Sequence, residues 1–587
     1  MAKRIAVVKP EKCNPAGCGD YLCMKLCPVN RSGSECILKS SRSKIIIEEM
    51  LCVGCKICSN RCPFDAITII NLPADFDAEP LHQYGKNGFR LFNLPVPKLG
   101  GVVGIIGVNG IGKSTVLKLL GNVFSPNLGR LDSEADTKEV LSFFKGTEAQ
   151  LYFERLYSEK LSVSYKPQQI DSIPVHYSGT VRELLLKSSE KALVEAFSEK
   201  FDLSKILDRS IKDISGGELQ RVAIAASLMK QADMYVMDEP TSYLDIKQRL
   251  KVARNISSGL TEKNTMLIVE HDLIILDYLT DFIHIMYGNP GAYGVVSQSK
   301  SSREGINSFL SGILREENVR FRDYEIKFQK HTPAKEKLSA SAVAEWDSLV
   351  LNLGNFSLKT GKGFLPKGSV IGVLGENGIG KTTFVKMLAG LEKPSSGKIS
   401  TTVKVSYKPQ YIPSDSGQPV SMVLADALIN HKAQLITPFE LDKLLDRKVN
   451  ELSGGELQRV AIARCLSQDA DLFLLDEPSA YLDVEQRIKL SKIIKSFMEE
   501  KGKTALIVDH DLLFVDYISE LLFVIRGEPA ISGELIGPMG MEDGMNLFLN
   551  DLFVTFRRDG ESGRPRANKL DSQQDKKQKK ANKLYYA

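Results

Sequence analysis

Residues Ser215–Ala225 read SGGELQRVAIA, and the same eleven residues return at Ser453–Ala463. The serine can cap a helix, and the two glycines let backbone N–H groups approach an anion at the positive end of that helix. The plainer interpretation is a capped helix that binds nothing. Because each copy is followed by an apolar run that ends in Asp-Glu, the sequence favours two anion-binding helix starts in a duplicated fold.

Length and composition are those of an ordinary globular protein with several domains. The chain has 587 residues, of which 43% are hydrophobic and 25% charged, and a formal net charge of +5. No apolar run reaches the roughly 18 residues of a membrane span. The start, MAKRIAVVKPEKC, lacks the apolar core of a signal peptide. We therefore expect a cytoplasmic protein with no membrane partner.

Nine of the ten cysteines lie between Cys13 and Cys62, and Cys465 stands apart. Such clustering favours a metal site over a disulfide framework. One motif has the spacing C-x2-C-x2-C-x3-C of bacterial ferredoxins and is followed by proline; it comprises Cys52, Cys55, Cys58 and Cys62. A looser copy upstream, also followed by proline, comprises Cys13, Cys18, Cys23 and Cys27.

In two-cluster ferredoxins the fourth cysteine of each run ligates the other cluster. One predicted [4Fe–4S] site therefore comprises Cys13, Cys18, Cys23 and Cys62, and the other comprises Cys27, Cys52, Cys55 and Cys58. Strand-like runs at 44–48 and 66–70 suit a ferredoxin-like fold. Four cysteines can also hold zinc, which is the alternative for both motifs. Cys36 is left over and is interpreted as a buried thiol.

Two glycine-rich loops have the phosphate-binding pattern that ends in Gly-Lys-Ser/Thr, each between an apolar strand and a helix. Lys113 is expected to reach the outer phosphates and Ser114 to bind Mg²⁺. Lys381 and Thr382 occupy the same places in the second copy. The other loop residues expected to contact the nucleotide are Asn109, Gly110, Gly112, Thr115, Asn377, Gly378, Gly380 and Thr383.

Paired acids end the apolar strands that follow each SGGELQ run. Asp238 is expected to hold Mg²⁺, and Glu239 to orient or deprotonate the attacking water. His271 ends the next strand; a lone histidine is usually structural, but this position favours a contact with the γ-phosphate. The second copy supplies Asp476, Glu477 and His510.

Two further pairs of residues complete the candidate ATP sites. Asp245 and Asp483 follow the paired acids in SYLD and AYLD. Tyr84 and Phe89 lie upstream of the first loop, where an aromatic ring could stack on adenine or could equally belong to the core.

The spacing between equivalent residues shows that the first half is longer. The loop lysines are 268 positions apart, but the glutamines of the two YKPQ segments, Gln168 and Gln410, are only 242 apart. About 26 extra residues therefore lie between Lys113 and Gln168. Apolar spacing predicts a helix–loop–helix over 136–160, and an insertion in one half indicates a role beyond ATP binding.

A second repeat follows each half. REGINSFL at Arg303–Leu310 matches EDGMNLFL at Glu542–Leu549, which indicates two paired hinge pieces. A polar linker is expected over about 330–345. The basic tail starts near Arg557. Such a run is usually a solvated, disordered tail, but its arginine-rich beginning is a candidate for nucleic-acid phosphate contacts.

The doubled loops, SGGELQ runs, Asp-Glu pairs and histidines resemble the ATP-binding cassette family over about 84–525. With the cysteine motifs, the insertion and the hinge pieces, the chain resembles subfamily E, the ribosome-recycling or RNase L inhibitor family of archaea and eukaryotes. The resemblance implies an α/β fold with tandem P-loop NTPase domains, an N-terminal ferredoxin-like iron–sulfur domain and paired hinges. The domains would span 1–75, 76–289, 290–345 with the linker, 346–527 and 528–587.

The resemblance implies two head-to-tail ATP sites, each with the phosphate loop of one half and the signature of the other. Gln168 and Gln410 would help to bind Mg²⁺. The Lys113 site would take Ser453, Gly454 and Gly455 from the second signature. The Lys381 site would take Ser215, Gly216 and Gly217.

The family's activity implies a monomeric ATPase that is an internal pseudo-dimer. ATP, Mg²⁺ and two [4Fe–4S] clusters would be its cofactors. After a release factor has acted, closure of the two halves would move the cluster domain and split the ribosome. The small subunit and its ribosomal RNA would then be held by the insertion and the hinges.

Three other functions use the same motifs. An ATP-coupled iron–sulfur electron-transfer protein would use the clusters to reduce a partner. A transporter ATPase would need a separate membrane subunit and has no use for the cysteines. A DNA-repair ATPase would carry a long coiled-coil insertion, which this sequence lacks.

Overall fold

The computed structural model describes residues 4–40, 44–72, 79–131, 135–158, 161–328, 338, 341–401, 403–410, 412–413 and 416–585. The chain divides into two compact units. Unit 1 comprises Met1–Ser242, Arg254–His271 and Leu279–Tyr324. Unit 2 comprises Tyr243–Ala253, Asp272–Tyr278 and Glu325–Ala587, and so includes two short segments of the first sequence repeat.

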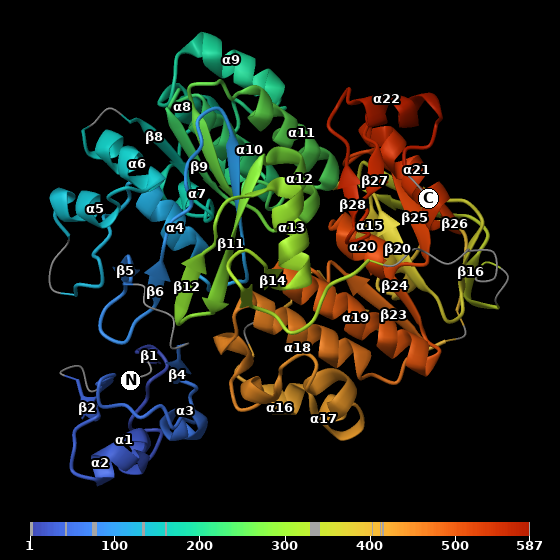
Figure 1. Ribbon diagram of the computed structural model, residues 1–587. Coiled ribbons are helices and arrows are strands. Elements are labelled where there is room, and N and C mark those ends of the chain that lie inside the picture. The colour runs from blue at the N-terminus through green and yellow to red at the C-terminus, as the bar shows by residue number, and fades with distance from the viewer. Residues whose placement is uncertain are drawn as a thin grey trace. The chain divides into compact units, whose positions relative to one another are not determined.

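The cysteine-rich part of unit 1 is built from short strand pairs and short helices, drawn in dark blue in Figure 1. Strands β1 (Arg4–Val8) and β4 (Ile67–Asn71) pair antiparallel, as do β2 (Ile37–Lys39) and β3 (Ile45–Ile47). The helices are α1 (Leu22–Leu26), α2 (Pro28–Arg31) and α3 (Ile57–Arg61). The predicted strands at 44–48 and 66–70 thus match β3 and β4. The expected boundary at 75/76 lies outside the described residues.

A mixed sheet forms the centre of unit 1. Its order is β5-β6-β12-β11-β7-β10-β9-β8, with β13 paired to β11. The strands are β5 (His82–Gln83), β6 (Arg90–Phe92), β7 (Val102–Ile106), β8 (Val163–Lys166), β9 (Met234–Asp238), β10 (Thr265–Val269), β11 (Phe282–Asn289), β12 (Tyr293–Val296) and β13 (Lys300–Ser301). Strands β7, β9 and β10 are buried at every position, because parallel strands covered on both faces need continuous apolar runs.

Helices flank this sheet and place the motifs at its carboxyl edge. Helix α4 (Lys113–Leu120) packs on β9 and β10, and α10 (Gly216–Leu228) packs on β8. Helices α7 (Ile173–His176), α8 (Val181–Leu186) and α9 (Lys191–Lys200) also belong to unit 1. Most of α11 (Ile246–Ser258) and α12 (Leu273–Leu279) lies in the two segments that belong to unit 2.

The segment between α4 and β8 carries two helices, α5 (Thr137–Phe143) and α6 (Glu148–Tyr157), within the range where a helix–loop–helix is expected. Phe144 and Phe153 stack with ring centroids 4.9 Å apart and belong to the core cluster that includes α4. The insertion is therefore packed on the first half (Figure 1). Residues 159–160 lie outside the described part.

Unit 2 repeats the design. Its sheet order is β17-β18-β26-β25-β20-β24-β23-β22. The strands are β17 (Leu349–Leu353), β18 (Phe356–Thr360), β20 (Val370–Leu374), β22 (Val405–Lys408), β23 (Leu472–Asp476), β24 (Thr504–Val508), β25 (Leu521–Glu528) and β26 (Ser532–Gly540). A second sheet has the order β19-β16-β21, from β16 (Ala342–Trp346), β19 (Gly363–Pro366) and β21 (Ile399–Thr401). Strand β16 begins inside the expected linker, most of which lies outside the described residues.

The helices of unit 2 occupy places equivalent to those in the first half. They are α15 (Lys381–Leu388), α16 (Val420–Val423), α17 (Ala425–Asn430), α18 (Gly454–Leu466), α19 (Val484–Lys501) and α20 (Leu512–Ile518). Helix α15 packs on β23 and β24, and α18 packs on β22. The repeated sequence therefore places the second set of motifs at the same edge of the second sheet.

The sequence repeat after each half forms a helix followed by a two-stranded hairpin. In unit 1 these are α13 (Ser302–Ser311), β14 (Ile313–Leu314) and β15 (Val319–Arg320). In unit 2 they are α21 (Met541–Leu552), β27 (Phe556–Arg558) and β28 (Pro565–Ala567), followed by α22 (Gln573–Lys580).

Candidate functional site

The first phosphate loop ends at the start of α4, beyond the carboxyl end of β7. Gly112 has a φ of +99°, and a Cβ there would lie 2.6 Å from Cζ of Phe89, so this position requires glycine. The Lys113 ammonium donates to the carbonyl oxygens of Gly107 and Val108 at 2.9 and 3.0 Å. The expected phosphate-binding lysine therefore lies across the loop rather than in solvent.

The second phosphate loop has the same geometry. Gly380 has a φ of +100°, and its Cβ position would lie 2.9 Å from Cζ of Phe356. The Lys381 ammonium donates to the carbonyl oxygens of Gly375 and Glu376 at 2.9 and 2.6 Å. Both halves therefore present a preformed phosphate loop.

The structure separates the two aromatic candidates for adenine stacking. Tyr84 is 46% exposed, and its hydroxyl lies 3.3 Å from Oγ1 of Thr115 in the first turn of α4. Phe89 packs against the core beneath Gly112. Phe356 lies equivalently beneath Gly380, which favours a supporting role for both phenylalanines and leaves Tyr84 as the accessible ring.

The carboxylate of Asp238 fits a magnesium ligand. Burial raises its pKa, although the Ser114 hydroxyl and the Lys113 ammonium act in the opposite direction. Among the described residues, Oδ1 of Asp238 has no hydrogen-bond partner. A buried carboxylate oxygen beside a serine hydroxyl provides the oxygen ligands that Mg²⁺ prefers. In the second copy, burial raises the pKa of Asp476 to about 6, with the Thr382 hydroxyl close by.

The two predicted catalytic glutamates lie beside their predicted partners. Oε1 of Glu239 accepts a hydrogen bond from Nε2 of Gln168 at 2.8 Å and lies 3.4 Å from Nε2 of His271. Oε1 of Glu477 accepts from Nε2 of Gln410 at 2.8 Å and lies 3.2 Å from Nε2 of His510. The glutamate, glutamine and histidine of each half therefore form one cluster.

The electrostatics of this cluster keep the glutamates ionised. Burial alone would raise the pKa of Glu239, but the hydrogen bond and charge of His271, with Lys113, lower it to about 2. Glu477 has a pKa of about 2 for the same reasons, with His510 as its main partner. Both carboxylates can therefore accept a proton from water at neutral pH only transiently, in the transition state.

In each half, the sequence analysis missed a lysine and a glutamine that donate hydrogen bonds to the backbone of the catalytic glutamate. Lys166 and Gln220 donate to the main-chain carbonyl of Glu239, at 3.2 and 2.8 Å. Lys408 and Gln458 do the same for Glu477, at 3.2 and 2.6 Å. The sequence could have indicated these residues, because the lysine lies in a YKPQ segment and the glutamine in an ELQR segment that both halves contain.

The two signature segments are capped helix starts, as expected. The backbone N–H of Glu218 donates to Oγ of Ser215 at 3.3 Å, and the N–H of Ser215 donates to the Glu218 carboxylate at 2.8 Å. Ser453 and Glu456 form the same reciprocal box at 3.4 and 2.8 Å. Such boxes stabilise the start of a helix without any ligand. The caps are therefore compatible with an anion-binding helix start and with a capped helix that binds nothing.

Asp245 makes a contact within unit 2 that bears on how the ATP sites are assembled. Its Oδ2 accepts a hydrogen bond from the backbone N–H of Asn377 at 3.1 Å, and the Lys247 ammonium lies 2.7 Å from Oε1 of Glu376. Asp245 and Lys247 come from the first sequence repeat, whereas Glu376 and Asn377 belong to the phosphate loop of the second. Asp483 caps α19 by accepting from the N–H of Gln486 at 2.9 Å.

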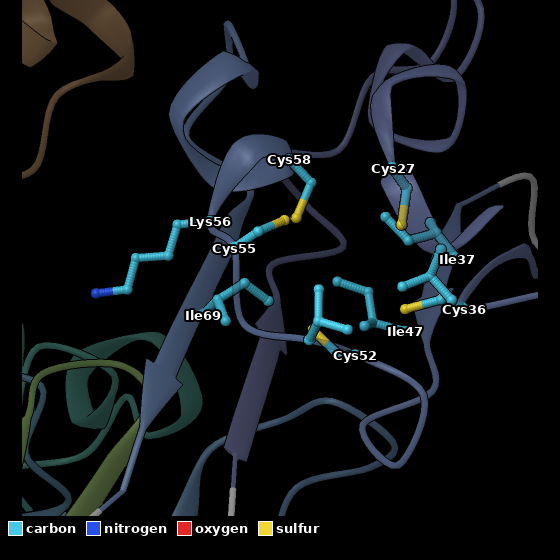
Figure 2. A pocket seen from close by; sticks show the side chains of 11 residues that line it. Cys27, Cys36, Ile37, Ile47, Cys52, Cys55, Lys56, Cys58 and Ile69 are labelled. Carbon is cyan, nitrogen blue, oxygen red and sulfur yellow. The ribbon is translucent and has the colours of Figure 1, made fainter. Parts of the chain in front are cut away.

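Figure 2 shows cysteine thiols around one small apolar cavity. The cysteines that line it are Cys27, Cys36, Cys52, Cys55 and Cys58. Four of these form the predicted second cluster set. Cys27 follows α1, Cys52 and Cys55 lie in the loop before α3, and Cys58 lies in α3. Burial and the neighbouring Cys52 raise the pKa of Cys58 to about 12. A cavity lined by four thiols and apolar side chains fits a [4Fe–4S] cluster.

The first predicted set is also brought together. Burial raises the pKa of Cys23 to about 11. The Met24 backbone acts in the opposite direction, and the neighbouring Cys18, Cys13 and Cys62 thiols add to the rise. The four thiols thus lie close enough to influence one another, although they span 50 positions. Within the described residues, no three His, Cys, Asp or Glu side chains converge on one point as ligands of a single metal ion would.

The cysteine-rich region is held on the nucleotide-binding part of unit 1 by defined contacts. The amide of Asn87 pairs with the backbone of Ile47 in both directions, at 2.8 and 2.9 Å. The Arg90 guanidinium lies 2.8 Å from the Glu49 carboxylate, and both side chains are largely buried. The region is therefore attached beside β6, next to the edge strand β5 of this sheet.

The structure corrects the hypothesis that the arginine-rich start of the tail contacts nucleic-acid phosphates. Arg564 is fully buried, and its guanidinium lies 3.0 Å from the Asp277 carboxylate. Arg566 donates to the same carboxylate at 2.6 and 2.9 Å. Since these charges already have a buried partner, they do not present a surface for phosphates. The lysines of α22 are exposed, as expected, but the expectation of a disordered tail is wrong, because this segment is a helix with buried Asp575 and Gln578.

Replacing one predicted ligand in each cysteine set should remove one cluster at a time. Cys58→Ala and Cys23→Ala are each expected to lower the iron content from about eight to about four per chain. Cys465→Ala, a buried cysteine of unit 2, is the matched control and should leave iron unchanged. Iron and sulfide assays with visible absorbance check this. Zinc in place of iron, or loss of all iron in Cys465→Ala, would contradict the assignment.

No helix among the described residues is long and apolar enough to cross a membrane.

Three family models match the sequence. "ABC transporter" matches residues 94–242 and 358–480, "4Fe-4S binding domain" matches 45–68, and "Possible Fer4-like domain in RNase L inhibitor, RLI" matches 4–35. Together they cover both phosphate loops, both signature segments, both Asp-Glu pairs and both cysteine motifs.

Related proteins match over most or all of the chain. The translation initiation factor RLI1 of Saccharomyces cerevisiae is 44% identical, over 99% of this chain and 98% of its own length. A solved structure described as a model of ribosome-bound archaeal Pelota and ABCE1 is 48% identical, covers all of both chains and has a TM-score of 0.90. The complex of archaeal ribosomal stalk protein aP1 with the archaeal ribosome recycling factor aABCE1 is 49% identical and has a TM-score of 0.83, covering 88% of this chain and all of that one.

Proposed function

The chain belongs to subfamily E of the ATP-binding cassette proteins, the ribosome-recycling RNase L inhibitor family, and on this basis we propose that it splits ribosomes into subunits by ATP-driven closure of its two halves. The observation that carries the proposal is the doubled catalytic cluster. Each half has a phosphate loop, an ionised glutamate and a histidine in contact. A cysteine-rich region is fixed to the first half.

Each ATP would lie between the phosphate loop of one half and the signature of the other. The contact between Asp245 and the N–H of Asn377 supports this arrangement, because it brings the first repeat to the phosphate loop of the second. The ATP held by Lys113 would meet Ser453, and the ATP held by Lys381 would meet Ser215. Closure would follow, since each γ-phosphate attracts helix-terminal donors from both sides.

The chemistry of each site would be hydrolysis of the bond between the β- and γ-phosphates. The carboxylate of Glu239 would orient a water molecule and accept its proton as the water oxygen bonds to the γ-phosphorus. His271 would hold the γ-phosphate, and Lys113 would offset the negative charge of the leaving ADP. Bound Mg²⁺, held by Ser114, Gln168 and Asp238, would neutralise charge on the phosphate oxygens. Glu477 and His510 would act in the second site.

The two [4Fe–4S] clusters would stabilise the cysteine-rich region, and the eight cysteines of the two sets would hold them. Motion of this region on closure would separate the ribosomal subunits, after a release factor or a related protein has acted. The small subunit and its ribosomal RNA would then be bound by the insertion and the hinge pieces. The chain would act as a monomer in the cytoplasm, where translation takes place.

A sedimentation experiment tests the function. Intact ribosomes, release factor, ATP and the protein are incubated together and separated on a sucrose gradient. We expect the intact-ribosome peak to shift to separate subunits. The Glu239→Gln/Glu477→Gln double variant binds ATP without hydrolysing it, so each molecule should split at most one ribosome, and ribosomes in excess over the variant should stay intact. Ribosomes that stay intact with the unmodified protein under all of these conditions would contradict the proposal.

A further inference from the structure

Each half contains a buried lysine that the ATP chemistry described above does not use. Lys166 ends β8, Lys408 ends β22, and each side chain is about 1% exposed. Lysine is almost never buried so completely unless its ammonium group is paired. The two positions are equivalent in the repeat, which indicates that the burial is part of the design of the site and not an accident of one half.

Both ammonium groups bind the backbone of the paired acids. Nζ of Lys166 donates to the carbonyl oxygens of Asp238 and Glu239 at 2.9 and 3.2 Å. Nζ of Lys408 donates to the carbonyl oxygens of Asp476 and Glu477 at 2.7 and 3.2 Å. An ammonium group has three donors and no acceptor, so one lysine can bind two successive carbonyls at once.

The backbone at this point adopts a conformation that needs support. Glu239 has a φ of +46° and Glu477 a φ of +47°, in the left-handed region that non-glycine residues avoid. Such conformations persist only where the surrounding structure holds them, and they occur preferentially at active sites. The side-chain amide of Gln220 adds a second donor to the Glu239 carbonyl at 2.8 Å.

We propose that Lys166 and Lys408 are positioning residues that hold the backbone of the catalytic glutamates in this conformation and so aim their carboxylates. The inference rests on the proposed ATPase sites. Lys166 is the last residue of β8, and Gln168 follows two positions later. Glu239 is therefore bound at two points from the end of one strand: Lys166 donates to its backbone carbonyl, and Gln168 donates to its carboxylate.

The position of the ammonium groups determines which step they affect. They contact main-chain oxygens behind the glutamate, whereas Lys113 and Lys381 lie in the phosphate loops. Loss of Lys166 should therefore leave ATP binding intact and slow hydrolysis. A displacement of about 1 Å in a reacting group can cost about 100-fold in rate, so we expect a decrease of 10- to 100-fold.

Lys166→Met and Lys408→Met test this in the full chain with its clusters, because methionine keeps most of the volume and removes the donors. ATP affinity is measured with a fluorescent ATP analogue, and hydrolysis by single turnover without ribosomes. Lys300→Met is the matched control, since Lys300 is also buried but bonds Glu316 away from the ATP sites. We expect the hydrolysis rate to fall in the first two variants, with an unchanged dissociation constant for ATP.

A second variant distinguishes the hydrogen bonds of the Lys166 ammonium group from the volume that its side chain fills. In Lys166→Ala, added ethylammonium should restore part of the hydrolysis rate, because it returns a donor to the cavity, and ethanol should not. Unchanged hydrolysis in the methionine variants, or equal rescue by both additives, would overturn the inference. The hydrolysis assay uses no ribosomes, so a negative result there would not contradict the ribosome-splitting function. Conversely, a failure to split ribosomes would not contradict the positioning role of the two lysines.

Discussion

Replacing Glu477 with glutamine is expected to slow ATP hydrolysis at the second site by about 10²- to 10⁴-fold while ATP stays bound, because glutamine keeps the shape of the side chain but cannot accept the proton of water. Glu239→Gln should do the same at the first site. Single-turnover hydrolysis and the nucleotide retained after rapid filtration measure both effects. In the double variant, hydrolysis should be lost from both sites. Glu262→Gln, an exposed glutamate, is the control.

The head-to-tail arrangement adds a crossed prediction to this one. In a Lys113→Ala background, which weakens ATP binding at the first site, hydrolysis reports on the site built on Lys381. There Ser215→Arg should lower hydrolysis about tenfold or more, since it removes a donor from the γ-phosphate. Ser453→Arg should have a much smaller effect. If Ser453→Arg caused the larger loss, each signature would serve its own half, and the composite sites would be wrong.

Removal of the Asp277 carboxylate should destabilise unit 2 strongly. Asp277→Asn leaves Arg564, which is fully buried, without the anion that lies 3.0 Å away. Breaking a buried ion pair from one side costs about 3–5 kcal/mol of the free energy of unfolding. Because the chain has two units, hydrogen exchange of the β28 amides resolves the effect better than one melting temperature.

A half-exposed pair provides the comparison for Asp277. The Arg526 guanidinium lies 2.8 Å from the Asp551 carboxylate in the same unit, with exposed side-chain fractions of 41% and 28%. Asp551→Asn should therefore change the free energy of unfolding by less than about 1 kcal/mol. Equal protection of the β28 amides in both variants would show that the Asp277 network contributes no more than a surface ion pair.

The ATP motifs could be predicted from the sequence because each is contiguous and occurs twice. Strand, glycine-rich loop and helix follow one another at Lys113 and at Lys381, so local chemistry decides the local structure. The glutamates beside their histidines were also predictable, since carboxyl ends of neighbouring parallel strands meet at one edge. The grouping of the cysteines followed from the exchange of the fourth ligand between two motifs.

Burial of charged residues could not be predicted in this way. A lysine next to Pro-Gln resembles a solvated side chain, and only the fold shows that Lys166 points at two carbonyl oxygens behind the active site. The tail arginines resembled a nucleic-acid contact because their partner, Asp277, lies 287 positions before Arg564. Composition and spacing carry no information on pairs so far apart, and packing alone brings them together.

The division of the chain into units has a practical consequence for dissecting the molecule. Two segments of the first repeat, Tyr243–Ala253 and Asp272–Tyr278, belong to the second unit. A fragment that starts after Tyr324 would therefore lack Asp277, the counter-ion of Arg564, and Asp245, which caps the backbone of Asn377. The second half of the sequence is therefore an incomplete folding unit by itself, because two segments of the first half complete it.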